Sequence, residues 1–153
     1  MNYKIIAEEL INKNITIGSC ESLTGGLFAS TISSIPGISK VYKGSIISYS
    51  TLIKESVVKV DHESVIEYGV VSSEVARQMA KNVKDILDVD LAISFTGNAG
   101  PDAMENKPVG LVYIGIAYKE EVKTYELHLE GTRDEIRNKC VEKAFELIKT
   151  NII

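Results

Sequence analysis

The stretch Ile15–Ser30, ITIGSCESLTGGLFAS, passes from a short apolar run through a carboxylate, two hydroxyls and a glycine pair into a second run of small and apolar residues. Residues 15–19 predict a strand, and Thr24 is a candidate N-cap for a helix that starts at Gly25. A strand followed directly by a helix is the repeating unit of α/β folds. The stretch therefore predicts a sheet that is covered by helices.

The segments on either side continue this alternation of helices and strands. The patterns predict helices over residues 3–12, 51–58, 73–87 and 132–149, and strands over residues 44–49, 90–95, 109–118 and 122–129. The last helix opens with the capping box Thr132-x-x-Glu135, and the last two strands form an antiparallel hairpin. We predict a single three-layer α/β/α domain over residues 1–153, with a mainly parallel, mixed sheet of about five strands.

Composition excludes several classes of protein. The chain is 44% hydrophobic and 25% charged, with a net charge of −4, as expected for an ordinary globular protein. Its Lys and Arg residues are scattered among Asp and Glu, which argues against a nucleic-acid partner. The longest apolar runs are strand-sized, so we expect no membrane partner and a cytoplasmic location.

The metal-binding residue types are sparse and separated in sequence. Cys20 and Cys140 belong to no CxxC motif, and His62 and His128 stand alone in different segments. We therefore predict no metal site and no cofactor, and two reduced thiols.

Three polar loops follow predicted strands, at residues 20–26, 49–54 and 96–107. Open α/β sheets place their sites at the carboxyl ends of strands, so these loops are the candidate site. In the first loop, Ser22 is either a turn serine bonded to backbone or a nucleophile, and this loop alone favours the turn serine. Thr24 fits a plain N-cap, and the N–H groups of Gly25 and Gly26 are candidate anion donors.

None of the three loops contains a histidine, so a nucleophilic Ser22 would need another base. Lys54 can serve if burial lowers its pKa, and Tyr49 can relay or donate a proton. The alternatives are an exposed helical lysine and an edge tyrosine. The third loop, from Thr96 through Asp102, is either a source of backbone donors for an anion or only a turn.

Several interrupted motifs resemble the CinA C-terminal domain family, the nicotinamide mononucleotide deamidases. They span nearly the whole chain in the family's order. The matching segments are Glu21–Gly26 (ESCTGG in the family), Gly44 with Tyr49–Thr51 and Lys54 (GxxxxY[ST]NxxK), Gly69–Ser72 (GAVS), Thr96–Pro101 (SGIAGP), Lys107–Tyr113 (KPVGTVY) and Gly131–Arg137 (GdR…iR).

The resemblance implies hydrolysis of the carboxamide of a small-molecule pyridine nucleotide, nicotinamide mononucleotide, without a metal. It implies Ser22 as nucleophile, with Tyr49 and Lys54 assisting, and a homo-oligomeric assembly. We expect the edge near residues 122–129 to pair with a neighbouring copy. Substrate contacts are predicted at Glu21, Thr24, Gly25, Gly26, Thr96, Gly97, Asn98, Ala99 and Gly100.

The sequence departs from the family pattern at three places. Leu23 replaces a cysteine, Thr51 replaces an asparagine, and residues 102–106 (DAMEN) replace a glycine-rich run. We expect the last change to reshape the pocket wall and alter substrate choice, and it supports an alternative, a non-catalytic nucleotide- or phosphate-binding module. The N-terminal domain of longer relatives has no counterpart here, so its pyrophosphatase activity is expected to be absent.

Overall fold

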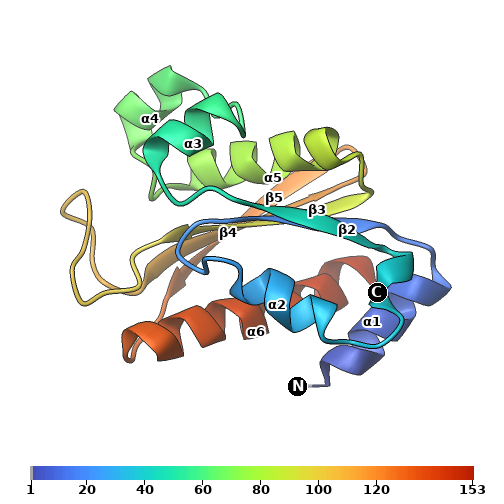
Figure 1. The fold of residues 1–153 in the computed structure, drawn as a ribbon. Coiled ribbons are helices and arrows are strands. Elements are labelled where there is room, and N and C mark those ends of the chain that lie inside the picture. Colours follow the sequence, from blue (N-terminus) through green and yellow to red (C-terminus); the bar gives the residue numbers. More distant parts are fainter. Residues whose placement is uncertain (1) are drawn as a thin grey trace.

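The computed structural model describes residues 2–153 and has a five-stranded sheet between two layers of helices (Figure 1). The strands are β1 (Ile17–Glu21), β2 (Tyr42–Ile47), β3 (Leu91–Gly97), β4 (Leu111–Tyr118) and β5 (Glu121–His128). The helices are α1 (Tyr3–Asn12), α2 (Leu27–Ser33), α3 (Thr51–Ser56), α4 (His62–Tyr68), α5 (Ser73–Leu87) and α6 (Arg133–Ile152), with a 3-10 turn, η1, at Ile38–Lys40. The predicted α/β/α arrangement is confirmed.

The strand order is β2-β1-β3-β4-β5. The sheet is mixed, because it contains both parallel and antiparallel pairs. Strand β1 pairs in parallel with β2 and β3, whereas β4 is antiparallel to both β3 and β5. The predicted hairpin is therefore present. Because β1, β2 and β3 run in the same direction, the loops that follow them emerge at one edge of the sheet.

The two faces of the sheet are covered by different helices: α1, α2 and α6 lie on one face, and α3, α4 and α5 on the other (Figure 1). Leu91, Ile93 and Phe95 of β3 belong to the larger core beneath α1, α2 and α6. The intervening small residues allow α5 to approach closely, and Ser94 Oγ donates a hydrogen bond to Ala76 O of α5 at 2.6 Å. The strand predicted over residues 90–95 is present as β3.

Three local predictions need correction. Strand β1 runs to Glu21 instead of ending at Ser19, because the carboxylate of Glu21 is buried and hydrogen-bonded. Helix α2 begins at Leu27, and Thr24 does not cap it: the Thr24 Oγ1 atom is buried without a hydrogen-bond partner among residues 2–153. Helix α4 was not predicted, because it has no buried residue and hence no apolar stripe.

Candidate active site

The three predicted loops meet where β1, β2 and β3 end. The Ser22 N–H donates to Phe95 O at 3.0 Å, and the Ser48 N–H donates to Glu21 O at 2.8 Å, so backbone contacts hold the loops together. A cavity of about 150 Å³ opens at this junction. Its lining includes Ser22 and Leu23 from the first loop, Tyr49 from the second, and Gly97, Asn98 and Ala99 from the third.

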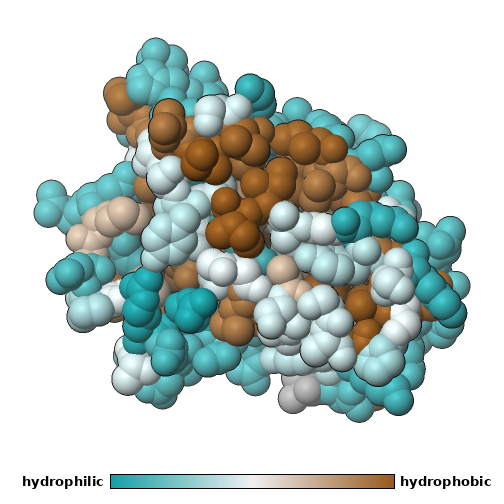
Figure 2. All heavy atoms as spheres, viewed as in Figure 1, coloured by the Kyte–Doolittle hydropathy of each residue, from teal (hydrophilic) through white to brown (hydrophobic). Residues whose placement is uncertain are grey.

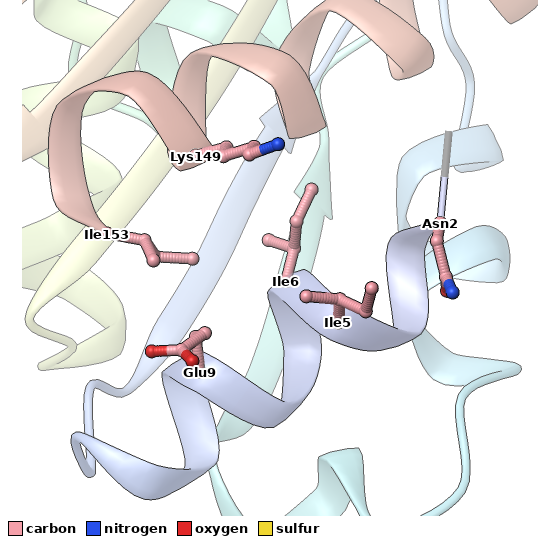
Figure 3. A pocket seen from close by; sticks show the side chains of 6 residues that line it. All are labelled: Asn2, Ile5, Ile6, Glu9, Lys149 and Ile153. Carbon is pink, nitrogen blue, oxygen red and sulfur yellow. The ribbon is translucent and has the colours of Figure 1, made fainter.

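A larger hollow of about 390 Å³ lies between α1 and the C-terminal end of α6 (Figure 3). Its lining is largely aliphatic, from Ile5, Ile6 and Ile153, and its charged groups are Glu9 and Lys149. It contains neither a nucleophile beside a base nor any residue of the three polar loops. The smaller cavity is lined by Ser22, whose hydroxyl contacts the buried Lys54, and it is therefore the candidate active site.

Ser22 and Lys54 are in direct contact. The Lys54 Nζ atom lies 2.9 Å from Ser22 Oγ and 2.7 Å from Ser48 O, and it donates hydrogen bonds to both. Lys54 is only 2% exposed and Ser22 only 7% exposed. The side chain of Lys54 reaches Ser22 from α3, whose N-cap is Ser50. The structure thus joins a hydroxyl and an amine that are 32 positions apart in sequence.

The environment of Lys54 favours the neutral amine. Burial lowers the pKa of Lys54 to about 8, although Cys20 and Glu105 act in the opposite direction. No carboxylate within residues 2–153 forms a salt bridge with Lys54. At neutral pH roughly one molecule in ten would then carry the uncharged form that can accept a proton.

Cys20 is the other nucleophilic side chain near this site. It is fully buried, and its Sγ atom lies 3.4 Å from Ser48 Oγ. Burial raises the pKa of the Cys20 thiol to about 11, so the reactive thiolate is scarce at neutral pH. Cys20 does not line the cavity, whereas Ser22 does.

Tyr49 lines the cavity but does not touch the Ser22–Lys54 pair. Its side chain is 60% exposed, and its hydroxyl accepts a hydrogen bond from Arg133 Nη2 at 2.7 Å. No hydrogen bond joins Tyr49 to Ser22 or to Lys54 among the described contacts. In this structure Lys54 contacts Ser22 directly, and the phenol of Tyr49 does not link the two side chains.

Glu21 holds the start of α2 and lies outside the cavity lining. Its carboxylate accepts hydrogen bonds from the N–H groups of Gly26, Phe28 and Ala29 at 3.0–3.2 Å, and from Ser19 Oγ. The Gly25 N–H donates to Ser22 O at 2.9 Å. The N–H groups of Gly25 and Gly26 are therefore already bonded, which corrects the expectation that they receive an anion. Glu21 replaces Thr24 as the group that satisfies this helix terminus.

We expect Glu21→Ala to lower the free energy of unfolding by roughly 2–4 kcal/mol, because it leaves buried N–H donors without an acceptor. Urea denaturation followed by circular dichroism measures this difference. Glu120→Ala is the matched control, because Glu120 is exposed in the turn between β4 and β5, and it should shift stability by less than about 0.5 kcal/mol. Equal effects of the two variants would contradict a structural role for Glu21.

The third loop is held in shape by its own side chains. Thr96 Oγ1 donates to Val70 O, and the Asn98 amide bonds to the backbone of Met104 and Lys107. A Cβ atom on Gly97 would lie 2.6 Å from Leu111 O, so only glycine fits where β3 passes β4. Thr96 and Asn98 therefore support the loop, while Gly97, Asn98 and Ala99 form part of the cavity wall.

Arginine side chains from α6 reach this site, and sequence reasoning gave them no role. Arg133 lines the cavity and donates to Gly100 O at 2.6 Å, in addition to Tyr49. Arg137 donates to Leu23 O and Thr24 O, at 3.1 and 2.9 Å, and so holds the Ser22 loop. Both arginines belong to the Gly131–Arg137 motif, which resembles the family pattern, but no function was predicted for this motif from the sequence.

Asp102 and Met104 also line the cavity, and Glu105 fastens the same loop. The Glu105 carboxylate accepts hydrogen bonds from the N–H groups of Val70 and Val71, at 2.9 and 3.0 Å, and from Lys107. Burial alone would raise the pKa of Glu105, but these N–H donors and the Lys107 ammonium bring it below its ordinary value. The segment that departs from the family pattern is thus anchored at Glu105 and faces the cavity through Asp102 and Met104.

Two further features concern metals and membranes. Within residues 2–153, no three His, Cys, Asp or Glu side chains come together in a way that could hold a metal ion. None of the helices in that part of the chain combines the length and the apolar character needed to cross a membrane.

Comparisons with known proteins identify the family. Residues 2–152 match the CinA C-terminal domain. A relative from Clostridium novyi (strain NT), named "Putative competence-damage inducible protein", is 44% identical over 98% of this chain and 36% of its own length. One of the same name from Listeria innocua is 42% identical over 95% of this chain and 35% of its own length. The chain thus spans about a third of the length of these curated relatives.

Solved structures give the same result. A competence-damaged protein (CinA) superfamily protein from Escherichia coli superposes with a TM-score of 0.93 at 26% identity, over 96% of this chain and 86% of that chain. The competence/damage inducible protein CihA from Agrobacterium tumefaciens superposes with a TM-score of 0.90 at 29% identity, over 98% and 95% of the two chains. Sequence and fold agree, and the chain belongs to the CinA C-terminal domain family.

Proposed function

We propose that this chain is an amidohydrolase that converts nicotinamide mononucleotide to nicotinic acid mononucleotide and ammonia. The observation that carries the proposal is the 2.9 Å contact between the buried Lys54 Nζ atom and Ser22 Oγ, at the wall of a cavity. A buried amine with a pKa of about 8 is suited to activate a serine. The motif-level resemblance to nicotinamide mononucleotide deamidases supports the choice of substrate.

The chemistry follows from this pair. Neutral Lys54 takes the Ser22 proton, and the Ser22 oxygen attacks the carboxamide carbon. The Lys54 ammonium then gives a proton to the amide nitrogen, which leaves as ammonia and leaves an acyl ester on Ser22. Lys54, neutral again, deprotonates a water molecule that attacks the ester. This step releases the carboxylate product and restores the Ser22 hydroxyl.

The oxyanion formed in each step needs hydrogen-bond donors. Leu23 and Ala99 line the cavity beside Ser22, and their backbone N–H groups donate to no protein acceptor among residues 2–153. The N–H groups of Gly25 and Gly26 are occupied. We therefore assign Leu23 and Ala99 as the donors, in place of the expected glycines.

Arg133 is our candidate for binding the nucleotide phosphate. A guanidinium has five N–H donors. That of Arg133 donates to only two acceptors among the described residues, Gly100 O and the Tyr49 hydroxyl. The remaining donors suit a phosphate oxygen. We expect Arg133→Met to raise KM for nicotinamide mononucleotide about 10- to 100-fold, with a smaller change in kcat.

Steady-state kinetics measures this split between KM and kcat. Lys139→Met is the control, because Lys139 is an exposed cation of α6 whose ammonium donates to Glu130 O, outside the cavity lining. An unchanged KM in Arg133→Met would contradict the assignment of the phosphate to Arg133.

The rival function is a nucleotide-binding module without chemistry, and its support is the unusual segment of residues 102–106 that faces the cavity. An ammonia-release assay with nicotinamide mononucleotide, run beside a thermal-shift titration with the same nucleotide, separates the two. Turnover to nicotinic acid mononucleotide supports the amidohydrolase. Thermal stabilisation without ammonia release would replace it with the binding module.

We also propose self-association through an open sheet edge. Strands β2 and β5 are the two edges of the sheet. Figure 2 shows hydrophobic side chains gathered near β2 and α3, where Ile47 and Leu52 are 42% and 73% exposed. The edge predicted from the sequence, β5, has exposed and half-buried positions as β2 does, but none of its residues is among the exposed large hydrophobic side chains, so we favour β2. Light scattering on the purified chain gives the oligomeric state.

A further inference from the structure

Charged side chains lie in the lining of the candidate active site and behind it. Arg133 lines the cavity, and the buried Lys54 lies behind its wall, with Nζ 2.9 Å from Ser22 Oγ. Lys54 is protonated in most molecules at neutral pH, since its pKa is about 8. Asp102 is the one carboxylate residue in the described lining. The described lining therefore has one positive group, Arg133, and one negative group, Asp102, and the ammonium of Lys54 lies buried beside Ser22.

Asp102 has no partner that would neutralise it within the protein. It forms no salt bridge within residues 2–153, and Arg133 donates to Gly100 and Tyr49 instead. Asp102 is also exposed, so nothing in the fold requires its carboxylate. An unpaired carboxylate that faces a cavity is available to a cationic ligand.

The other walls of the cavity suit a flat ring. Leu23 and Ala99 are each 5% exposed and form the inner part of the wall, whereas Tyr49 and Met104 are 60% and 51% exposed and lie toward solvent. Aromatic and thioether side chains pack well against aromatic rings. A ring between these walls would lie near Ser22, with Asp102 in the same lining.

We propose that Asp102 selects a positively charged, N-substituted pyridinium carboxamide over the same molecule with an uncharged ring. The inference deepens the proposed amidohydrolase function and rests on it for the carboxamide. Without Asp102, Arg133 would be the one charged side chain in the described lining, and a pyridinium ring there would meet its positive charge and that of Lys54 behind Ser22. With Asp102, attraction offsets this repulsion at the ring, while Arg133 remains available to an anionic group elsewhere on the ligand.

Binding of two matched ligands tests the proposal without turnover. Nicotinamide mononucleotide has a pyridinium ring, and its 1,4-dihydro form has the same carboxamide, ribose and phosphate but a neutral ring. Isothermal titration calorimetry on Ser22→Ala measures both affinities. We expect the pyridinium form to bind about 5- to 10-fold more tightly, the size of one partly screened charge pair.

Adding Asp102→Asn should remove this preference, by weakening the pyridinium form about 5-fold and leaving the dihydro form within 2-fold. Asp102→Glu should retain the preference, because it keeps the charge. Glu120→Gln removes an exposed carboxylate outside the cavity and should change neither affinity. A preference that persists in Asp102→Asn, the absence of any preference with Asp102 present, or no binding of the pyridinium form overturns the proposal.

The outcome can be separated from the fate of the proposed function. Ammonia release by the unmodified chain together with a preference that does not depend on Asp102 would overturn the role of Asp102 and leave the amidohydrolase intact. An Asp102-dependent preference without ammonia release would support the role of Asp102 and overturn the catalytic proposal.

Discussion

Ser22→Ala is expected to lower kcat for ammonia release from nicotinamide mononucleotide by at least ~10⁴-fold, because it removes the atom that attacks the carboxamide. Ser22 Oγ accepts only one side-chain hydrogen bond, from Lys54, and Ser22 is 7% exposed. The substitution removes few packing contacts, so the variant should unfold at nearly the same temperature as the unmodified chain. A coupled assay for ammonia, with a melting curve, measures both quantities.

The matched control is Ser30→Ala, which removes an exposed hydroxyl from α2. It should leave both kcat and the melting temperature nearly unchanged. Residual activity of Ser22→Ala above about a tenth of the unmodified value would exclude Ser22 as the nucleophile. Cys20, the nearest other nucleophilic side chain, would then need to be tested by Cys20→Ser.

Lys54→Met is expected to lower kcat/KM by about 10²- to 10⁴-fold, the usual contribution of a general base. The pH dependence gives a second test. Only neutral Lys54 can take the Ser22 proton, so kcat/KM of the unmodified chain should rise with pH and level off above about 8, the pKa of Lys54. This acid limb should disappear from the residual activity of Lys54→Met, and its persistence would indicate a different base.

The same substitution should stabilise the fold. Burial lowers the pKa of Lys54 from an ordinary value of 10.5 to about 8, so between these pH values the unfolded chain binds more protons than the folded chain. Stability therefore rises with pH across this window, and below pH 8 the buried ammonium has its full destabilising effect. We expect Lys54→Met to gain about 1–3 kcal/mol at pH 7 and to lose most of that advantage by pH 10.

Denaturation curves at several pH values check this prediction. Lys81→Met is the control, because Lys81 is exposed on α5 and should show no such change between pH 7 and pH 10. A lower stability of Lys54→Met at pH 7 would mean that the lost hydrogen bonds to Ser22 and Ser48 outweigh the removal of the buried charge.

The fold was largely predictable because hydrophobic periodicity reports which faces are buried. The helix predicted over residues 73–87 and the strand predicted over residues 90–95 are such cases, and the structure confirms both as α5 and β3. The end of β1 was missed because a carboxylate usually marks a surface position, whereas Glu21 is buried beneath the N–H groups of α2. Helix α4 gave no apolar signal, since none of its residues is buried.

The candidate site was predictable as three loops, because parallel strands place their carboxyl ends at one edge. The contacts within it were not. Arg133 reaches Tyr49 across 84 positions in sequence, a pairing that no local pattern encodes. The occupied N–H groups of Gly25 and Gly26 depend on where the Glu21 side chain points, which spacing alone leaves open.

The most direct measurement is the titration of Lys54 itself, followed by NMR of the chain with carbon-13 at the lysine ε positions and assigned through Lys54→Met. Activation of Ser22 by a neutral lysine requires a pKa of about 8 that coincides with the acid limb of kcat/KM. A value near the ~10.4 of a free lysine, with an acid limb elsewhere, would contradict it.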